Sequence, residues 1–303
     1  MMNVFTHPFS HSFVFLNRLF THSILHSHNI TNLNPLATLS NLSALLFSYN
    51  NVNDLSPLAN LTNLTSLWFN DNKVTDLSQL VNLSNLRLLS IENNEVSNLT
   101  PLQNLTNLES LFSRSNQVSD LSPLENLPNL WRLWLCENQV SDLTPLQNLT
   151  NLQELWINDT HVNNLTPLQS LTNLTTLNFK SNIVSDLTPL QNLTNLTILV
   201  FSDNNVSDIS PLQNLSNLTI LVFSDNNVSV ISPVQNLTSL TYLDFSNNTV
   251  SDIQPLINNT GLGDGDNVDM PYNNLDLTPG SQNMNDINTL IGRGVGVEYE
   301  PQN

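Results

Sequence analysis

The sequence has 303 residues and carries 25 acidic against seven basic side chains, a formal net charge of −18 at pH 7. This excess argues against binding nucleic acid or an anionic membrane by general electrostatics, because both attract basic proteins. The single cysteine, Cys136, rules out an intramolecular disulfide and a cysteine-based zinc site. No apolar run reaches the roughly 20 residues of a membrane-spanning helix.

The first 41 residues are an N-terminal cap or a decayed repeat. Residues 1–19 hold Phe, His and Ser in a composition of their own, and fit a cap, a truncated or misread start, or a targeting signal. A basic n-region is missing and the apolar run is interrupted, which disfavours the targeting signal. Residues 20–41 resemble the pattern that follows, with a serine at one expected apolar site and apolar side chains in register at Leu25, Ile30, Leu33, Leu36 and Leu39.

Residues 42–261 form ten consecutive repeats of 22 residues without insertion or deletion, such as LTSLWFNDNKVTDLSQLVNLSN at 64–85. Positions 1, 4, 6, 11, 14, 17 and 20 are apolar at 68 of 70 places, and the exceptions are Ser113 and Asn259. Position 9 is Asn except at Thr160, and position 16 is Pro except at Gln79. This period predicts a solenoid whose stacked coils bury one continuous core.

Each part of the repeat has a physical reading. Alternation around positions 4 and 6 predicts a short strand with positions 3, 5 and 7 facing outward. The Asn at position 9 can donate and accept, so stacked copies can satisfy backbone groups at a turn. The Asp and Pro that follow predict a capped turn or 3₁₀ segment. The expected fold is an α/β solenoid, mostly β with little α-helix: a right-handed coil with a concave parallel sheet and convex 3₁₀ turns.

Residues 262–303 break the period and are predicted to be a C-terminal capping segment, because a terminal repeat needs one polar face. A last strand and turn in a stretched register are indicated by Val268, Met270, Asn274 and Leu275. A helix is expected from Asp286 onward, and a final strand over residues 295–298.

Two groups of residues invite a metal site. The spacing of His22, His26 and His28 would suit zinc on a helix, but no stable helix and no nearby carboxylate are evident, which favours a low-complexity terminus. Asp264, Asp266 and Asp269 leave calcium open, although the spacing does not complete a calcium-binding loop and the adjacent glycines suit a turn.

The aspartates at position 13 of the repeats are interpreted as a column of turn caps: Asp54, Asp76, Asp120, Asp142, Asp186, Asp208 and Asp252. No phosphate loop, nucleophile elbow or dinucleotide fingerprint is present. We therefore expect a protein that is not an enzyme and that needs no cofactor.

The repeat, written LxxLxxLxFxxNxVSDLxPLxNLTN, resembles the 22-residue leucine-rich repeats of bacterial internalin-like proteins. The resemblance implies a scaffold for protein recognition, with the partner selected by variable residues on the concave sheet. Relatives of this type are typically secreted or attached to the cell surface, although no signal peptide or anchor motif is visible in the sequence. The segment after residue 261 also resembles the closing segments of such arrays.

The positions that the repeat leaves variable hold the candidate binding residues. Aromatic side chains gather at position 5, one tryptophan stands at position 2, and four of the seven basic residues fall on strand segments. An exposed aromatic stripe with arginines is typical of a binding hot spot. The predicted partner-binding residues are Trp68, Phe112, Arg114, Trp131, Arg132, Trp134, Trp156 and Lys180.

The expected partner is a protein and the chain is expected to be a monomer, with no nucleic acid bound and no membrane insertion. Three alternatives stay open: aromatics that only shield the strands, a spacer or adhesin segment of a surface protein, and a glycan-binding module. The irregular repeat at 108–129 predicts an underpacked spot at Ser113, with Phe112 either facing outward or swung inward to fill it.

Overall fold

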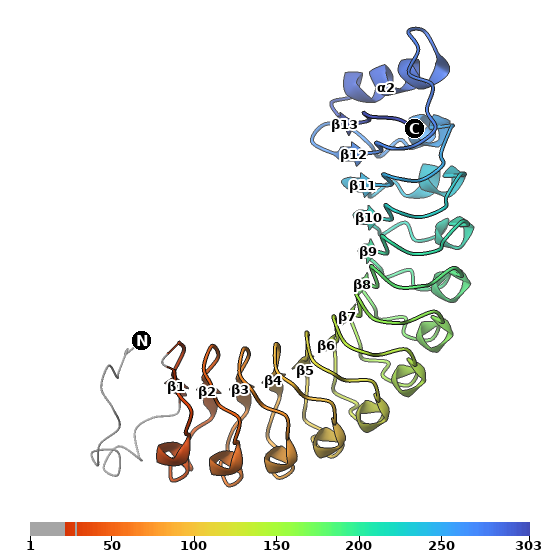
Figure 1. The fold of residues 1–303 in the computed structure, drawn as a ribbon. Coiled ribbons are helices and arrows are strands. Elements are labelled where there is room, and N and C mark those ends of the chain that lie inside the picture. Colours follow the sequence, from red (N-terminus) through yellow and green to blue (C-terminus); the bar gives the residue numbers. More distant parts are fainter. Residues whose placement is uncertain (1–21, 28) are drawn as a thin grey trace. The chain divides into compact units, whose positions relative to one another are not determined.

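The computed structural model describes residues 22–27 and 29–303, so the alternatives for residues 1–19 and the prediction for His28 lie outside the described residues. The chain divides into two compact units, of which one ends at Val140 and the other spans Ser141–Asn303. We call them the N-terminal unit and the C-terminal unit. In both, each repeat carries its strand on one side of the coil and its helical turn on the other (Figure 1).

In the N-terminal unit, neighbouring strands pair in parallel and in sequence order. The strands are β1 (His22–Ile24), β2 (Ala44–Leu46), β3 (Ser66–Trp68), β4 (Leu88–Ser90), β5 (Ser110–Phe112) and β6 (Arg132–Trp134). The 3₁₀ turns are η2 (Asn34–Leu36), η3 (Ser56–Leu58), η4 (Ser78–Leu80), η5 (Thr100–Leu102) and η6 (Ser122–Leu124). The decayed repeat is confirmed over its described residues, since Ser23 pairs with Leu45 in register.

The C-terminal unit has the same parallel order. Its strands are β7 (Glu154–Trp156), β8 (Thr176–Asn178), β9 (Ile198–Val200), β10 (Ile220–Val222), β11 (Tyr242–Asp244), β12 (Asn267–Asp269) and β13 (Gly296–Glu298). Its helical segments are η7 (Thr144–Leu146), η8 (Thr166–Leu168), η9 (Thr188–Leu190), η10 (Ser210–Leu212), η11 (Ser232–Asn236), α1 (Gln254–Asn258) and α2 (Gln282–Gly292). The predicted solenoid with little α-helix is confirmed.

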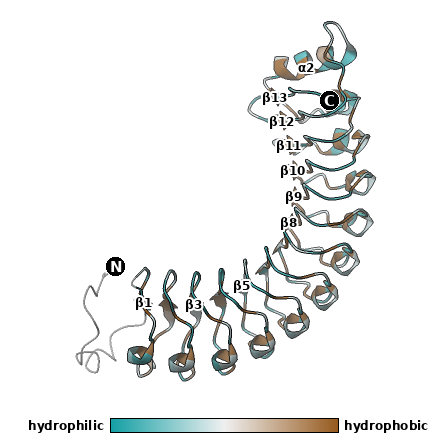
Figure 2. Cartoon of the chain, in the orientation of Figure 1, coloured by the Kyte–Doolittle hydropathy of each residue, from teal (hydrophilic) through white to brown (hydrophobic). Residues whose placement is uncertain are grey.

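The core consists of the predicted inward positions. Leucines at position 4 align from strand to strand, as Leu177 does with Leu199, and are fully buried. At position 6, rings stack between repeats: the Phe179 and Phe201 centroids lie 5.5 Å apart with planes 9° from parallel. Figure 2 shows hydrophobic and hydrophilic residues recurring in the same order along successive coils. Each coil therefore buries its apolar edge against its neighbours.

The asparagines at position 9 form the predicted ladder. Asn204 Oδ1 accepts the Val184 N–H of the preceding repeat at 2.9 Å. Its Nδ2 donates to the carbonyls of Phe179, Phe201 and Ser202. The residue before each of these asparagines adopts a left-handed backbone, with φ between 51° and 59° from Tyr49 to Asn247, although none is glycine. The ladder amide thus ties down the tight bend that this conformation creates.

The predicted role of the aspartate column is confirmed. Each aspartate accepts the N–H of the residue two positions later, at the start of the 3₁₀ turn. Asp76, for example, also accepts the Ser78 hydroxyl at 2.7 Å, and this hydrogen bond lowers the pKa of the Asp76 carboxyl. Asn98 and Asn164 take the same place in their own repeats.

Ser113 lies on the core side of β5 and is fully buried, and its hydroxyl has no hydrogen-bond partner. Phe112 is on the opposite face, where its ring contacts Trp134 and Trp68. The outward alternative for Phe112 is therefore the one observed. The core at this level lacks the large side chain that Ile91 and Leu135 supply in the adjacent repeats.

Ser113→Leu is expected to raise the free energy of unfolding by about 1–2 kcal/mol, because it removes an unsatisfied hydroxyl and adds buried apolar area. Equilibrium urea unfolding would measure the gain. Ser113→Ala is the matched control, since it removes the hydroxyl without filling the space. A loss of stability in the leucine variant would mean that Ile91 and Leu135 have already closed the gap.

The C-terminal end continues the ladder through Asn273, which accepts the Val250 N–H at 3.0 Å. The prediction that Asn274 takes this place was wrong by one residue, because the longer connection after Gly261 shifts the register. The end is fastened by α2: Asn283 Nδ2 donates to the Ser251 carbonyl, and Arg293 donates to the Ile257 carbonyl at 2.8 Å.

Asp286, on α2, is 4% exposed, and one of its carboxyl oxygens has no hydrogen-bond partner. Burial, with Asp252 nearby, raises the pKa of this carboxyl. A raised pKa favours the protonated folded state, so wild-type stability falls as pH rises through that pKa. Asp286→Asn is therefore expected to be more stable than wild type at pH 7. The difference should fade below about pH 4, where the unfolded carboxyl is also protonated. Thermal melts across this range would test it, and a pH-independent difference would contradict it.

Candidate functional site

The outward face of the N-terminal unit carries an aromatic cluster, which we define as Trp68, Phe112, Trp131, Arg132 and Trp134. The Phe112 ring meets the Trp134 ring edge-on, with centroids 4.7 Å apart. On its other side it contacts the Trp68 ring at 6.1 Å. The three rings thus make a continuous aromatic ridge that starts on β3 and ends on β6.

Ser90 allows this ridge to form. It lies on β4, between the strands of Trp68 and Phe112, and pairs in register with both residues. Its small side chain is fully buried, and its hydroxyl donates to Asn70 Oδ1 at 2.7 Å. Because Ser90 is small, the rings of Trp68 and Phe112 can meet across it although their strands are not adjacent.

Trp131 and Arg132 extend the cluster along one edge. The Arg132 guanidinium carbon lies 4.3 Å from the centre of the Trp131 ring and 5.9 Å from that of Phe112. This is cation–π geometry, which holds both side chains in a fixed arrangement. The three tryptophans are half-buried, whereas Phe112 is only 6% exposed. Phe112 therefore supports the tryptophans from below, a role that column position alone does not predict.

The other arginines of this face are paired with carboxylates. Arg114 Nη2 lies 2.5 Å from Glu137 Oε1, and Arg87 Nη2 lies 2.6 Å from Glu109 Oε1. Hydrogen bonds from Ser115 and Arg114 hold the pKa of the Glu137 carboxyl below its usual range. The predicted residue Arg114 thus lies beside the cluster with its charge already balanced. The sequence could have indicated these pairs, since the partners are 22 or 23 residues apart.

The remaining predicted residues, Trp156 and Lys180, belong to the C-terminal unit. Trp156 is half-buried on β7 and pairs in register with Asn178. Lys180 is exposed two residues after β8, and its backbone N–H donates to Asn178 Oδ1.

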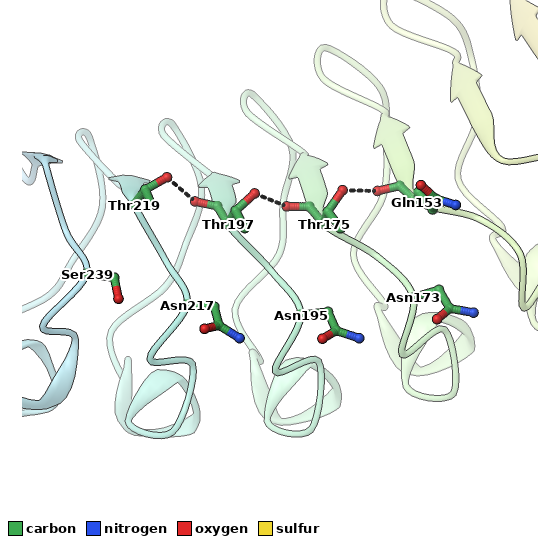
Figure 3. Close-up of a pocket in the computed structure, with 8 residues that line it drawn as sticks. All are labelled: Gln153, Asn173, Thr175, Asn195, Thr197, Asn217, Thr219 and Ser239. Atoms are coloured by element: carbon green, nitrogen blue, oxygen red, sulfur yellow. Dashed lines mark hydrogen bonds between the residues drawn. The ribbon is translucent and has the colours of Figure 1, made fainter.

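A groove of about 610 Å³ also runs along the C-terminal unit, beside the strands (Figure 3). Its upper row is made of threonines, each of which donates its hydroxyl to the carbonyl at the same position of the preceding repeat. Its lower row is made of asparagines that donate to the carbonyl 23 residues earlier, as Asn195 does to Thr172. The threonines are Thr175, Thr197 and Thr219, and the asparagines are Asn173, Asn195 and Asn217.

Both rows of this groove use a donor to bind neighbouring backbone, and no charged side chain lines it. We interpret the groove as stitching between repeats. The N-L-T triplets that generate it look like glycosylation acceptors in the sequence, which conceals their role in hydrogen bonding.

The described part of the chain contains no group of three His, Cys, Asp or Glu residues that could hold a metal ion. The three aspartates considered for calcium include two with roles inside the fold. Asp266 Oδ2 accepts the Gly263 N–H at 2.8 Å, and Asp269 Oδ2 accepts the Tyr242 hydroxyl at 2.6 Å. None of the described helices has the length and apolar character that crossing a membrane requires.

Comparison with known proteins places these features in context. The family model of leucine-rich repeats in two copies matches residues 40–82, 150–192, 172–214 and 216–258. No curated protein matches the chain in sequence.

Two internalins of Listeria monocytogenes are similar in structure. One (inlF) is 29% identical with a TM-score of 0.79, over 95% of this chain and 88% of its own. Internalin C2 (inlC2) is 35% identical with a TM-score of 0.50, over 66% of this chain and 80% of its own. The plant peptide hormone receptor RGFR1, solved in complex with RGF2, shares the fold at 21% identity and a TM-score of 0.71, over 92% of this chain and 47% of its own.

Proposed function

Because the chain belongs to the leucine-rich-repeat proteins of the bacterial internalin type, we propose that it is a non-enzymatic scaffold that binds a protein partner through its outward strand face. The anchor of this interaction is the aromatic cluster. Its tryptophans are half-buried, and they stand on short strands whose inward side chains are locked in the core. Rigid aromatic side chains on a rigid sheet lose little conformational entropy when a partner packs on them.

The contact of Trp68 and Phe112 across Ser90 is the observation that carries the proposal. Aromatics that merely shield the sheet would each cover their own strand, whereas these join into one ridge. A contiguous apolar surface of this kind marks interaction sites. The paired charges of Arg114–Glu137 and Arg87–Glu109 beside it form a polar rim, the usual surrounding of a binding centre.

A protein ligand fits this surface better than a glycan. Sugar rings stack on aromatic faces that are open to solvent, but the Arg132 guanidinium stacks on the Trp131 ring, and Phe112 is nearly buried. Apolar side chains of a protein partner can instead pack between and beside the tryptophans.

Trp134→Ala is expected to weaken partner binding by about 2 kcal/mol or more, roughly 30-fold in Kd, because a central aromatic anchor is lost. A partner recovered by cross-linking from the native host would supply the ligand, and calorimetry the affinity. The melting temperature should change little, since the half-buried ring packs outside the core.

Glu125→Gln is the matched control, because this residue is exposed on the turn side of the coil next to η6. It should bind like wild type. If Trp134→Ala and Trp68→Ala both bind the partner as tightly as wild type, the cluster only shields the sheet, and the spacer interpretation replaces the proposal.

A further inference from the structure

The C-terminal unit presents an apolar patch on its outward face that is separate from the aromatic cluster. Ile198 and Val200 on β9 pair in register with Ile220 and Val222 on β10. All four side chains face away from the core and are partly exposed, between fully buried leucines at position 4. Strands in a sheet lie about 4.8 Å apart, so the four β-branched side chains form one flat patch.

The neighbouring strands limit this patch. On β8 the corresponding residues are Thr176 and Asn178, and on β11 they are Tyr242 and Asp244. The apolar surface therefore ends abruptly at β8, and at β11 it meets an acidic side chain in line with Val222.

Carboxylates line one side and one end of the patch. Asp203 and Asp225 are exposed in the turns that follow β9 and β10. Beyond β10, register places Asp244, Asp269 and Glu298 in line with Val222 on successive strands. Asp269 is held by the Tyr242 hydroxyl, and Asp244 accepts the Ser246 N–H. These hydrogen bonds fix the carboxylates in place and leave their other lone pairs for a ligand.

The opposite side of the patch is uncharged. Thr197 and Thr219 donate their hydroxyls to backbone carbonyls of the preceding repeat. The unit as a whole contains sixteen acidic residues against Lys180 and Arg293, and Arg293 is bound to backbone carbonyls near α1. The field over the patch is therefore negative, unlike the charge-paired rim of the aromatic cluster.

We propose that the patch formed by Ile198, Val200, Ile220 and Val222 is a second docking surface, which binds a cationic, apolar segment of a protein. Apolar side chains of that segment cover the four residues, and its Lys or Arg side chains reach Asp203, Asp225 and Asp244. Charge complementarity selects this occupant, since the carboxylates repel phosphates and anionic lipids. The surface is flat, which suits a polypeptide better than a small molecule.

The proposal shares with the proposed function only the premise that the ligand is a protein, and a test can separate the two. The full chain, carrying Trp134→Ala to silence the aromatic cluster, is used to select binders from a random peptide phage library at low salt. Selected sequences are expected to be enriched in Lys and Arg together with apolar residues. A synthetic peptide from the pool should lose affinity as salt is raised.

The deciding variant replaces the patch by the residues of β8: Ile198→Thr, Val200→Asn, Ile220→Thr and Val222→Asn. The fold already accommodates these residues at the same positions in Thr176 and Asn178. Binding of the synthetic peptide is expected to fall at least about tenfold. Asp203→Asn with Asp225→Asn should weaken binding severalfold and reduce its salt dependence, and asparagine already occupies the equivalent positions at Asn93 and Asn247.

Two results would overturn the proposal: a selected pool without basic enrichment, or peptides that bind the β8-like variant as tightly as the chain with the intact patch. Since the bait lacks Trp134, neither result bears on the aromatic cluster. Circular dichroism of the β8-like variant shows that a loss of binding is not a loss of fold.

Discussion

Replacing Leu155 by alanine is expected to lower the free energy of unfolding by about 2–5 kcal/mol, the range found for buried leucines. Leu155 is fully buried on β7 and pairs in register with Leu177, which in turn aligns with Leu199. These leucines are fixed by the strand hydrogen bonds on either side, so they cannot shift far to fill the space. The cost should lie toward the upper part of the range.

The matched control is Thr176→Ala, on the adjacent strand but with its side chain outward and half-buried. It should change stability by no more than about 0.5 kcal/mol, as exposed substitutions do. Urea titrations followed by circular dichroism give both values. Similar losses in the two variants would mean that inward and outward positions have been exchanged, which a one-residue slip of the strand register would produce.

Strict periodicity explains why so much of the fold could be predicted. Every repeat samples the same environment, so ten copies of the pattern determine the inward positions, the ladder asparagine and the capping aspartate. The departures occur where the period fails. After Gly261 the connection lengthens, and the ladder role passes to Asn273 instead of Asn274. The close approach that requires Gly261 itself, a Cβ position 2.0 Å from the Thr238 carbonyl oxygen, also depends on this last coil.

The left-handed residue before each ladder asparagine could not be recognised by its type. Tyr49, Glu137 and Asp203 all adopt this conformation, and none is a residue that requires it. The conformation is imposed by the bend and stabilised by the hydrogen bonds of the following asparagine.

The candidate site could be predicted by column but not by contact. Reading position 5 down the array finds Trp68, Phe112 and Trp134. The sequence does not show that Ser90 lets two of these rings meet, because that depends on rotamers. It likewise does not show that Arg114 is paired with Glu137. The apolar patch on β9 and β10 was missed because isoleucine and valine are ordinary strand residues, and only their exposed position makes them informative.

The ladder itself is expected to be nearly as sensitive as the leucine core. Asn204→Ala should lower the free energy of unfolding by about 2–4 kcal/mol, mainly because a buried donor is left unsatisfied. The carbonyls of Phe179 and Phe201 keep second donors in Asn182 and Asn226. The Val184 N–H depends on Asn204 Oδ1, which accepts it at 2.9 Å.

This difference between the partners gives the prediction a local signature. In Asn204→Ala, the Val184 amide is expected to exchange its hydrogen much faster than in wild type, while the strand amides of β9 stay protected. Hydrogen exchange followed by NMR measures both. Asn204→Thr is the matched control, because Thr160 occupies the same position naturally and donates to the Ile157 carbonyl at 2.8 Å. The threonine variant should therefore be less destabilised than the alanine variant. If Val184 keeps its wild-type protection in Asn204→Ala, the backbone is held by the left-handed turn alone, and the asparagine ladder does not stabilise the array.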